Sequence, residues 1–100
     1  MKYTLKPTTQ FKKDLKLIQK RGLKIELLSE VLTMLANGET VPEKYRDHSL
    51  SGNYSHCREC HIQPDWLLIY EYAHDTLILY LTRTGSHSDL FWNLYGYPFG

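Results

Sequence analysis

The sequence is short of cysteine and of long apolar runs, and both shortages exclude classes of protein. Two of its 100 residues are cysteine, too few for a four-thiolate metal site. No window of about 18 uninterrupted apolar residues occurs, so we expect no membrane span. The N-terminal stretch MKYTLKPTTQF lacks the apolar segment of a secretion signal. We therefore expect a cytoplasmic protein whose thiols stay reduced.

The chain also lacks a strong net charge and any internal repeat. Its formal net charge is +1, and 42% of its residues are hydrophobic. This balance is typical of a folded chain and argues against disorder. A chain of this length is expected to form one small domain around a single core.

Basic side chains are crowded into the first quarter of the chain. Residues 2–24 hold eight of the twelve lysines and arginines: Lys2, Lys6, Lys12, Lys13, Lys16, Lys20, Arg21 and Lys24. Asp14 is the only acidic residue in that range, and the remaining chain is net acidic. The asymmetry suggests an anionic partner such as RNA. A solvated helix face is the alternative reading of the same charges.

Hydrophobic periodicity predicts the order β-α-α-β-β-β. We expect strands at 2–6, 54–62, 66–73 and 76–83, and helices from residue 8 or 9 to 21 and from 24 to 36. The tight turns near 63–65 and 74–75 predict an antiparallel meander. The expected class is α+β: an N-terminal strand and a helical hairpin packed on a small, mostly antiparallel sheet.

Residues 57–61 read CRECH, the C-x-x-C-H pattern of c-type haem attachment. Alternate residues of a strand face opposite sides, so Cys57 and His61 share one face and Cys60 lies on the other. Thiolates on opposite faces cannot bind one ion, and the motif does not open a helix as a thioredoxin-type site does. We therefore expect no metal, no cofactor and a core position for Cys60. A metal or redox protein remains a disfavoured alternative.

Three histidines stand where strands or loops end. His61 precedes the turn that contains Asp65, His87 follows the last strand beyond Arg83, and His48 lies in the preceding loop. A histidine can donate or accept a proton near neutral pH, and an arginine fork can bind phosphate oxygens. Each histidine alone is more often a surface residue than a catalyst. Together with Asp65 and Arg83 they would suit phosphodiester chemistry.

Three ordered motifs closely resemble the YafQ branch of the RelE-like toxins of bacterial type II toxin–antitoxin systems. They are DHSLSG at 47–52, RECHIQPDWLLIY at 58–70 and RTGSHSDLF at 83–91. Residues 9–17, TQFKKDLKL, are similar to the first helix of the family. The resemblance covers about residues 2 to 91. It implies a toxin domain at 1–91 and an aromatic C-terminal tail at 92–100, where family members often end near position 91.

The resemblance implies a metal-independent endoribonuclease that cuts messenger RNA on the ribosome. It places His48, His61 and Asp65 in an acid–base cluster, with Arg83 stabilising the transition state and His87 acting as general acid. We expect the 2′-hydroxyl of RNA to be the nucleophile, deprotonated by His61 with Asp65 and His48. The toxin is expected to be a monomer that joins a cognate antitoxin protein in a hetero-oligomer.

RNA contacts are expected outside the catalytic cluster. Phe91 matches an aromatic residue near the substrate, and Trp66 matches another, although Trp66 opens a buried strand and core packing is favoured for it. Lys12, Lys13 and Lys16 of the first helix would hold the phosphate backbone. The alternative to an enzyme is a non-catalytic RNA-binding or antitoxin-binding module with the same fold.

Overall fold

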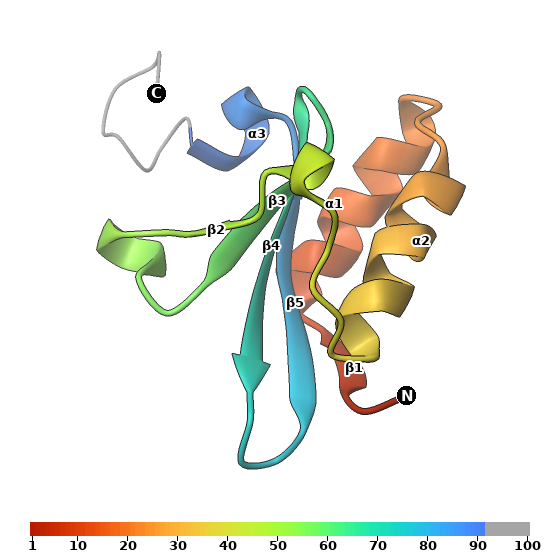
Figure 1. The fold of residues 1–100 in the computed structure, drawn as a ribbon. Coiled ribbons are helices and arrows are strands. Elements are labelled where there is room, and N and C mark those ends of the chain that lie inside the picture. The colour runs from red at the N-terminus through yellow and green to blue at the C-terminus, as the bar shows by residue number, and fades with distance from the viewer. Residues whose placement is uncertain (92–100) are drawn as a thin grey trace.

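A five-stranded mixed sheet forms the centre of the molecule (Figure 1). The computed structural model describes residues 1–91. The strands are β1 (Thr4–Pro7), β2 (His48–Ser49), β3 (Arg58–Gln63), β4 (Trp66–Ala73) and β5 (Ile78–Gly85). Their order across the sheet is β1-β5-β4-β3-β2, and only the β1–β5 pair is parallel. The predicted antiparallel meander is therefore confirmed.

Two helices cover one face of this sheet, as the sequence predicts. They are α1 (Thr9–Lys20) and α2 (Ile25–Ala36). The hydroxyl of Thr8 caps α1 by accepting a hydrogen bond from the Phe11 amide at 3.0 Å. Arg21 ends α1, and Gly22 then adopts a φ of 77°, a left-handed conformation that glycine tolerates. Capping and turn chemistry thus place both ends of α1.

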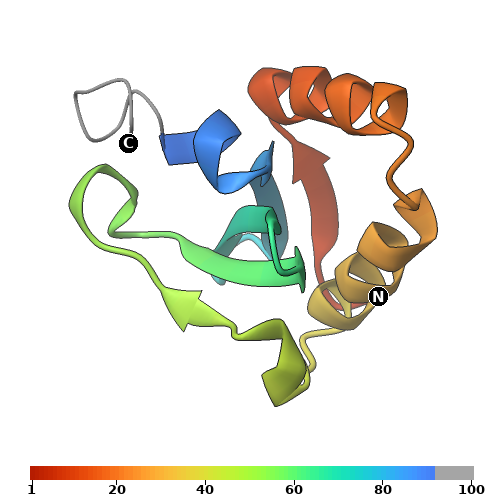
Figure 2. The ribbon, with the colours of Figure 1, turned by 90° about the horizontal axis from the view of Figure 1, so that it is seen from above.

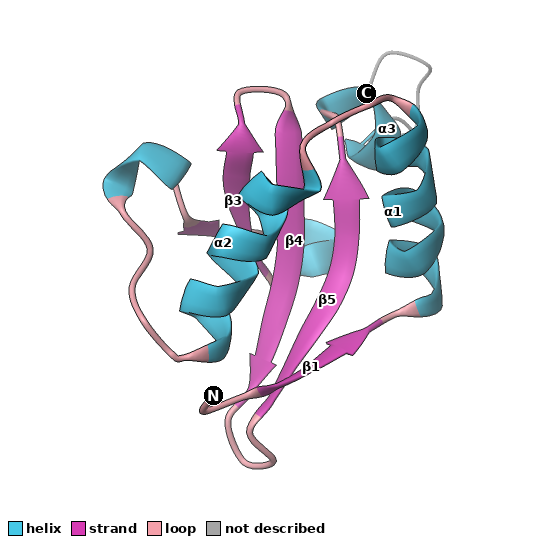
Figure 3. Cartoon of the chain, turned by 90° about the vertical axis from the view of Figure 1, so that its right-hand side faces the viewer, coloured by secondary structure: helices cyan, strands magenta, loops and turns pink. Residues whose placement is uncertain are grey.

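The two helices diverge as they cross the sheet. Figure 3 shows α1 running beside β5 while α2 crosses the sheet obliquely toward β3. The main core lies between the helices and the sheet, with fully buried side chains from every layer: Ile18, Leu28, Val31, Leu35, Cys60, Leu68, Tyr70 and Leu79. The predicted helical hairpin is present, but its two helices diverge. α1 therefore lies against β5, and α2 lies against β3.

A second, smaller core lies on the opposite face of the sheet. Cys57, Leu67, Ile69 and Leu90 form it, under α3 (His87–Phe91). Figures 1 and 2 show α3 on the side of the sheet away from α2. Strand β4 therefore contributes side chains to two cores, which explains its almost uninterrupted apolar sequence. The apolar run of β4 predicts this burial, whereas no sequence pattern predicted α3.

The predicted strand at 54–62 begins too early. Residues Gly52–Tyr54 form a short 3₁₀ helix, and β3 starts only at Arg58. The Cys57 amide donates to the Tyr54 carbonyl at 2.8 Å, which closes a loop before the strand. Even so, Cys57 packs in the second core and Cys60 in the main core. The expected separation of the two thiols by the sheet is confirmed.

A cluster of polar contacts holds the start of α3. Asp89 accepts from the Ser86 amide at 2.9 Å, and the Ser86 hydroxyl accepts from the Asp89 amide at 3.1 Å. This reciprocal pair satisfies two amides at the N-terminus of the helix. The Arg21 guanidinium adds a two-point contact to the same carboxylate, at 2.5 and 3.0 Å. α1 and α3 are thus joined at the point where His87 begins its helix.

None of the helices within residues 1–91 is long and apolar enough to cross a membrane. The expected aromatic tail at 92–100 lies outside the described residues.

The Arg21–Asp89 contact predicts a specific loss of stability in acid. The hydrogen bond from Arg21 lowers the pKa of Asp89 from its ordinary 3.8 to about 2. A carboxyl group whose pKa is lower in the folded state stabilises above its ordinary pKa, and that contribution disappears as pH falls toward the folded value. We expect Asp89→Asn to lower the urea midpoint near neutral pH, with the difference from wild type shrinking between about pH 4 and pH 2.

Asp75→Asn, in the exposed β4–β5 turn, is the matched control and should leave the midpoint unchanged. A difference in urea midpoint between wild type and Asp89→Asn that persists at about pH 2 would contradict this account of the Arg21–Asp89 contact.

Candidate active site

Histidines from three elements converge at one end of the sheet. His61 comes from β3, His48 from β2, and His87 from the first position of α3. The ring centroids of His61 and His87 lie 5.7 Å apart, and those of His48 and His61 lie 6.3 Å apart. The β3–β4 turn and the β5–α3 junction meet at this end, and that brings positions 61 and 87 together. The predicted convergence of the histidines is confirmed.

Asp65 is paired with His87 and not with His61, which corrects the expected grouping. Its Oδ1 accepts from the His87 amide at 2.9 Å and lies 2.6 Å from His87 Nδ1. The backbone hydrogen bond and then the side-chain hydrogen bond from His87 lower the pKa of Asp65. A carboxylate can only accept, so it fixes the hydrogen on Nδ1. Nε2 is then the nitrogen of His87 left for proton transfer to a substrate.

Glu59 takes the place beside His61 that Asp65 was expected to fill. It is 4% exposed, and its Oε1 lies 3.6 Å from His61 Nε2 and 3.4 Å from His48 Nε2. Its other oxygen is buried and makes no hydrogen bond within the described part of the chain. A signal for it was present in the sequence, because residues 59 and 61 of one strand share a face. Glu59 was nevertheless not among the predicted site residues.

The surroundings of His61 favour its neutral form. Burial is the largest cause lowering its pKa, and the nearby charges of His87, His48 and Arg46 lower it further. Glu59 opposes them by favouring the imidazolium. A carboxylate facing Nε2 favours the tautomer with the hydrogen there, which leaves the lone pair on Nδ1. His61 can therefore accept a proton at neutral pH.

Arg83 is bound by a carboxylate from α1. Its Nε and Nη2 donate to Asp14 at 2.7 and 3.1 Å. Pairing with β1 ends at Leu81, so the last residues of β5 form a free edge. Asp14 fills that edge by also accepting from the Thr84 amide at 3.1 Å. Asp14 is therefore the acidic partner of Arg83, and convergence of the guanidinium with the imidazoles stays a prediction.

The expected RNA-contacting residues fall into different environments. Trp66 is 1% exposed, and its indole donates to the Thr84 hydroxyl at 2.9 Å, so no ring face is open to a base. The core position favoured for Trp66 from sequence is confirmed, and its RNA contact stays a prediction. Lys12, Lys13 and Lys16 are exposed on α1. Phe91 is half-buried beside the second core.

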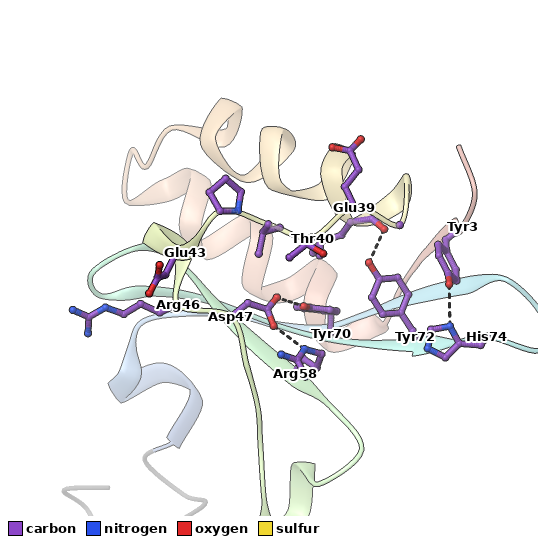
Figure 4. A pocket seen from close by; sticks show the side chains of 14 residues that line it. Tyr3, Glu39, Thr40, Glu43, Arg46, Asp47, Arg58, Tyr70, Tyr72 and His74 are labelled. Atoms are coloured by element: carbon purple, nitrogen blue, oxygen red, sulfur yellow. Dashed lines mark hydrogen bonds and ion pairs between the residues drawn. The ribbon is translucent and has the colours of Figure 1, made fainter.

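A tyrosine-rich cavity of about 410 Å³ lies on the other side of β3 from the imidazoles. Figure 4 shows Asp47 between Tyr70 and Arg58, with hydrogen bonds to both. Asp47 directly precedes His48, so these contacts hold the chain where it enters β2. Within the cavity, Tyr3 and His74 bind each other at 2.9 Å. We read this network as support for the position of His48.

A separate group of possible metal ligands lies near the second core. Ligand atoms of His56, Cys57 and Glu71 lie within 4.8 Å of one another. Burial raises the pKa of the Cys57 thiol. The group shares no residue with the histidine cluster, and it differs from the Cys57–Cys60 pair that the CRECH pattern suggests.

The family model described as "Bacterial toxin of type II toxin-antitoxin system, YafQ" matches residues 3–92. The chain belongs to the YafQ toxin family. Its similarity to the mRNA interferase toxin YafQ of Escherichia coli K12 is 41% identity over 83 residues, covering 82% of this chain and 88% of that protein. The family resemblance stated from three motifs is confirmed.

Solved structures place this YafQ-family chain in the same fold. A metal-bound toxin from Helicobacter pylori superposes with a TM-score of 0.84 at 42% identity, covering 89% of this chain and 99% of that one. The toxin of the E. coli DinJ–YafQ toxin–antitoxin complex gives 0.81 at 36% identity, with coverages of 91% and 99%. The expected α+β RelE-like class is confirmed.

The contact between Glu59 and the histidines predicts a change in the titration of His61. Because Glu59 favours the imidazolium, Glu59→Gln should lower the pKa of His61 still further. We expect its Cε1 proton resonance, followed by NMR against pH, to titrate at lower pH than in wild type. Glu71→Gln removes a carboxylate that lies 3.7 Å from His56 and should leave the His61 titration in place. Equal titration of His61 in all three proteins would contradict the assignment.

Proposed function

We propose that this YafQ-family chain is an endoribonuclease toxin that cleaves messenger RNA through the 2′-hydroxyl of the RNA itself. The observation that supports it most directly is the facing pair His61 and His87, 5.7 Å apart, each with its own carboxylate. Two histidines at this spacing can act on opposite sides of one phosphodiester. The E. coli relative named an mRNA interferase toxin, which matches 82% of this chain, supports the same activity.

His61 is the proposed general base. Its lowered pKa keeps the imidazole neutral, and Glu59 directs the hydrogen to Nε2. Nδ1 removes the 2′-hydroxyl proton while the 2′-oxygen attacks the adjacent phosphorus. His48 shares Glu59 with His61, and its Nδ1 donates to the Arg46 carbonyl at 2.7 Å. We assign His48 to the same half of the reaction, as a group that keeps Glu59 and His61 in place.

His87 is the proposed general acid. As an imidazolium with Nδ1 held by Asp65, it donates the Nε2 proton to the 5′-oxygen as the P–O5′ bond breaks. The products are a 2′,3′-cyclic phosphate, which water can open to a 3′-phosphate, and a 5′-hydroxyl. The proton taken by His61 and the proton given by His87 balance, so no redox partner and no metal enters the scheme.

Arg83 has a narrower role in this proposal than in the sequence-based one. Asp14 occupies its Nε and Nη2, so a phosphate oxygen would be bound through Nη1. Phe91, at the end of α3, follows His87 by one helical turn and is proposed to contact the substrate beside it.

Partners are proposed from the same relatives. A similar structure is that of a toxin bound to the antitoxin DinJ, so we propose that a cognate antitoxin binds this chain, which is a monomer by itself. Messenger RNA on the ribosome is the proposed substrate, and the cytoplasm is therefore the proposed location. The exposed lysines of α1 would follow the phosphate backbone without choosing bases.

His87→Ala should leave a folded protein with activity reduced by about 10²–10⁴-fold, the usual contribution of one proton-transfer group.

We expect RNA with 2′-O-methyl at the cut position to resist the wild-type protein, and activity to survive dialysis against EDTA. In growth assays, the wild-type chain alone should be toxic, whereas His87→Ala or co-expression with the antitoxin should not. Efficient cutting of the 2′-O-methyl RNA would overturn the mechanism. Toxicity of His87→Ala equal to that of the wild type, with no RNA cleavage by either protein, would favour the non-catalytic binding module.

Reversing the charge of Lys12, Lys13 and Lys16 to Glu should weaken ribosome association at low salt, because three phosphate contacts are lost. Sedimentation with purified ribosomes measures this. The triple change of Lys2, Lys6 and Lys24 to Glu alters net charge equally and is the control. Equal effects of the two triple variants would show that net charge, and not this face of α1, governs association.

A further inference from the structure

We propose that the cleft beside His61 and His87 is a nucleotide subsite in which Arg46 binds a phosphate of the RNA. The wall formed by Tyr45, Ile62 and Pro64 would receive the attached base. This proposal rests on the proposed ribonuclease function and adds to it a second phosphate-binding arginine. Tyr45 and Arg46 lie on the segment between α2 and β2, which none of the sequence motifs covers, whereas Ile62 and Pro64 come from the end of β3 and the turn after it.

The cleft is large enough for a nucleotide and opens onto the catalytic histidines. Its volume is about 640 Å³, within the range of small-molecule sites. His61 and His87 line it together with Arg46 and Lys44. Apolar side chains, one amide and one acid complete it: Leu27, Tyr45, Ile62, Pro64, Gln63 and Glu30. A cleft lined by both cations and apolar side chains offers contacts for the phosphate and for the base of a nucleotide.

Arg46 is distinguished from the other arginines by its lack of an acidic partner. Arg21 pairs with Asp89, Arg58 with Asp47, and Arg83 with Asp14. Within residues 1–91, the Arg46 guanidinium makes no ion pair, and the residue is exposed. An arginine that is already neutralised by a carboxylate binds a phosphate less readily than a free one. Arg46 is therefore the arginine available to the substrate.

The backbone of Arg46 explains where its side chain points. Its φ and ψ are 51° and 43°, a left-handed conformation uncommon outside glycine, at the end of the short 3₁₀ helix Glu43–Tyr45. Its carbonyl accepts the His48 Nδ1 hydrogen bond. Figure 4 shows the side chain directed away from Asp47 and from the tyrosines. One residue thus holds His48 with its carbonyl and lines both the tyrosine-rich cavity and the cleft beside His61.

Arg46 lies close enough to His61 for its charge to affect the pKa of that imidazole. It is one of the positive charges that lower the pKa of His61, with His87 and His48. A phosphate bound to Arg46 would therefore lie near the proposed base. Lys44 supplies a second cation, with its Nζ 5.1 Å from the centre of the Tyr45 ring. Glu30 of α2 repels anions from its own side of the cleft, so the phosphate is expected on the side of Arg46.

The test is binding of an RNA octamer of mixed sequence that carries 2′-fluoro at every ribose and therefore cannot be cleaved. Fluorescence anisotropy would follow binding at several low salt concentrations. Arg46→Asn removes the charge, and asparagine tolerates the left-handed backbone, so the fold is retained. Arg46→Lys keeps the charge without the planar fork, and Lys24→Ala removes one exposed cation elsewhere.

We expect Arg46→Asn to weaken binding by roughly tenfold and to reduce the salt dependence by about one phosphate contact. Arg46→Lys should be intermediate and Lys24→Ala close to wild type. In NMR titrations of the free protein, Arg46→Asn should raise the pKa of His61, because a nearby positive charge is removed.

Binding by Arg46→Asn within twofold of wild type, or no binding by wild type at low salt, would overturn the subsite. Failure of the proposed function is a separate result: the wild-type protein would bind the octamer through Arg46 and leave unmodified RNA intact. Equal cleavage and equal binding by wild type and Arg46→Asn would retain the function and reject the subsite.

Discussion

Burial of β4 on both faces is the constraint on which the rest of the structure depends. Leu68 and Tyr70 pack under α1 and α2, whereas Leu67 and Ile69 pack under α3. A strand covered on both sides cannot shift its register without exposing one apolar set, so its ends are fixed in space. The turn before β4 and the strand beside it therefore present His61 and Asp65 at one defined end of the sheet.

Three carboxylates hold the histidines of the candidate site in position through contacts with different groups. Asp65 holds His87, Glu59 lies between His48 and His61, and Asp89 secures the helix on which His87 stands. The two imidazoles proposed to react are thus set by different acids, and in such an arrangement one group can serve as base and the other as acid. Arg83 forms an ion pair with Asp14 and so joins α1 to the edge of β5.

Local patterns were enough for the elements with strong periodicity. The Thr8 cap and Gly22 mark the ends of α1, and the apolar run of β4 with its flanking turns marks the meander. They were not enough for α3, a helix of five residues, because so short a segment has little periodicity of its own and is held by Arg21 from a distant helix. The predicted start of β3 was too early for a similar reason. Backbone hydrogen bonds of the loop, which the side-chain pattern does not reveal, determine where the 3₁₀ helix ends and the strand begins.

The sequence by itself determined the fold class, the family and the set of ionisable residues from which a site could be built. Only the tertiary structure decided which of them are partners: Asp65 with His87, Glu59 with His61, and Arg83 with Asp14. The physical reason is that charge pairing depends on distances of a few ångströms between separate elements. Those distances follow from strand register and helix packing, which spacing along the chain does not contain.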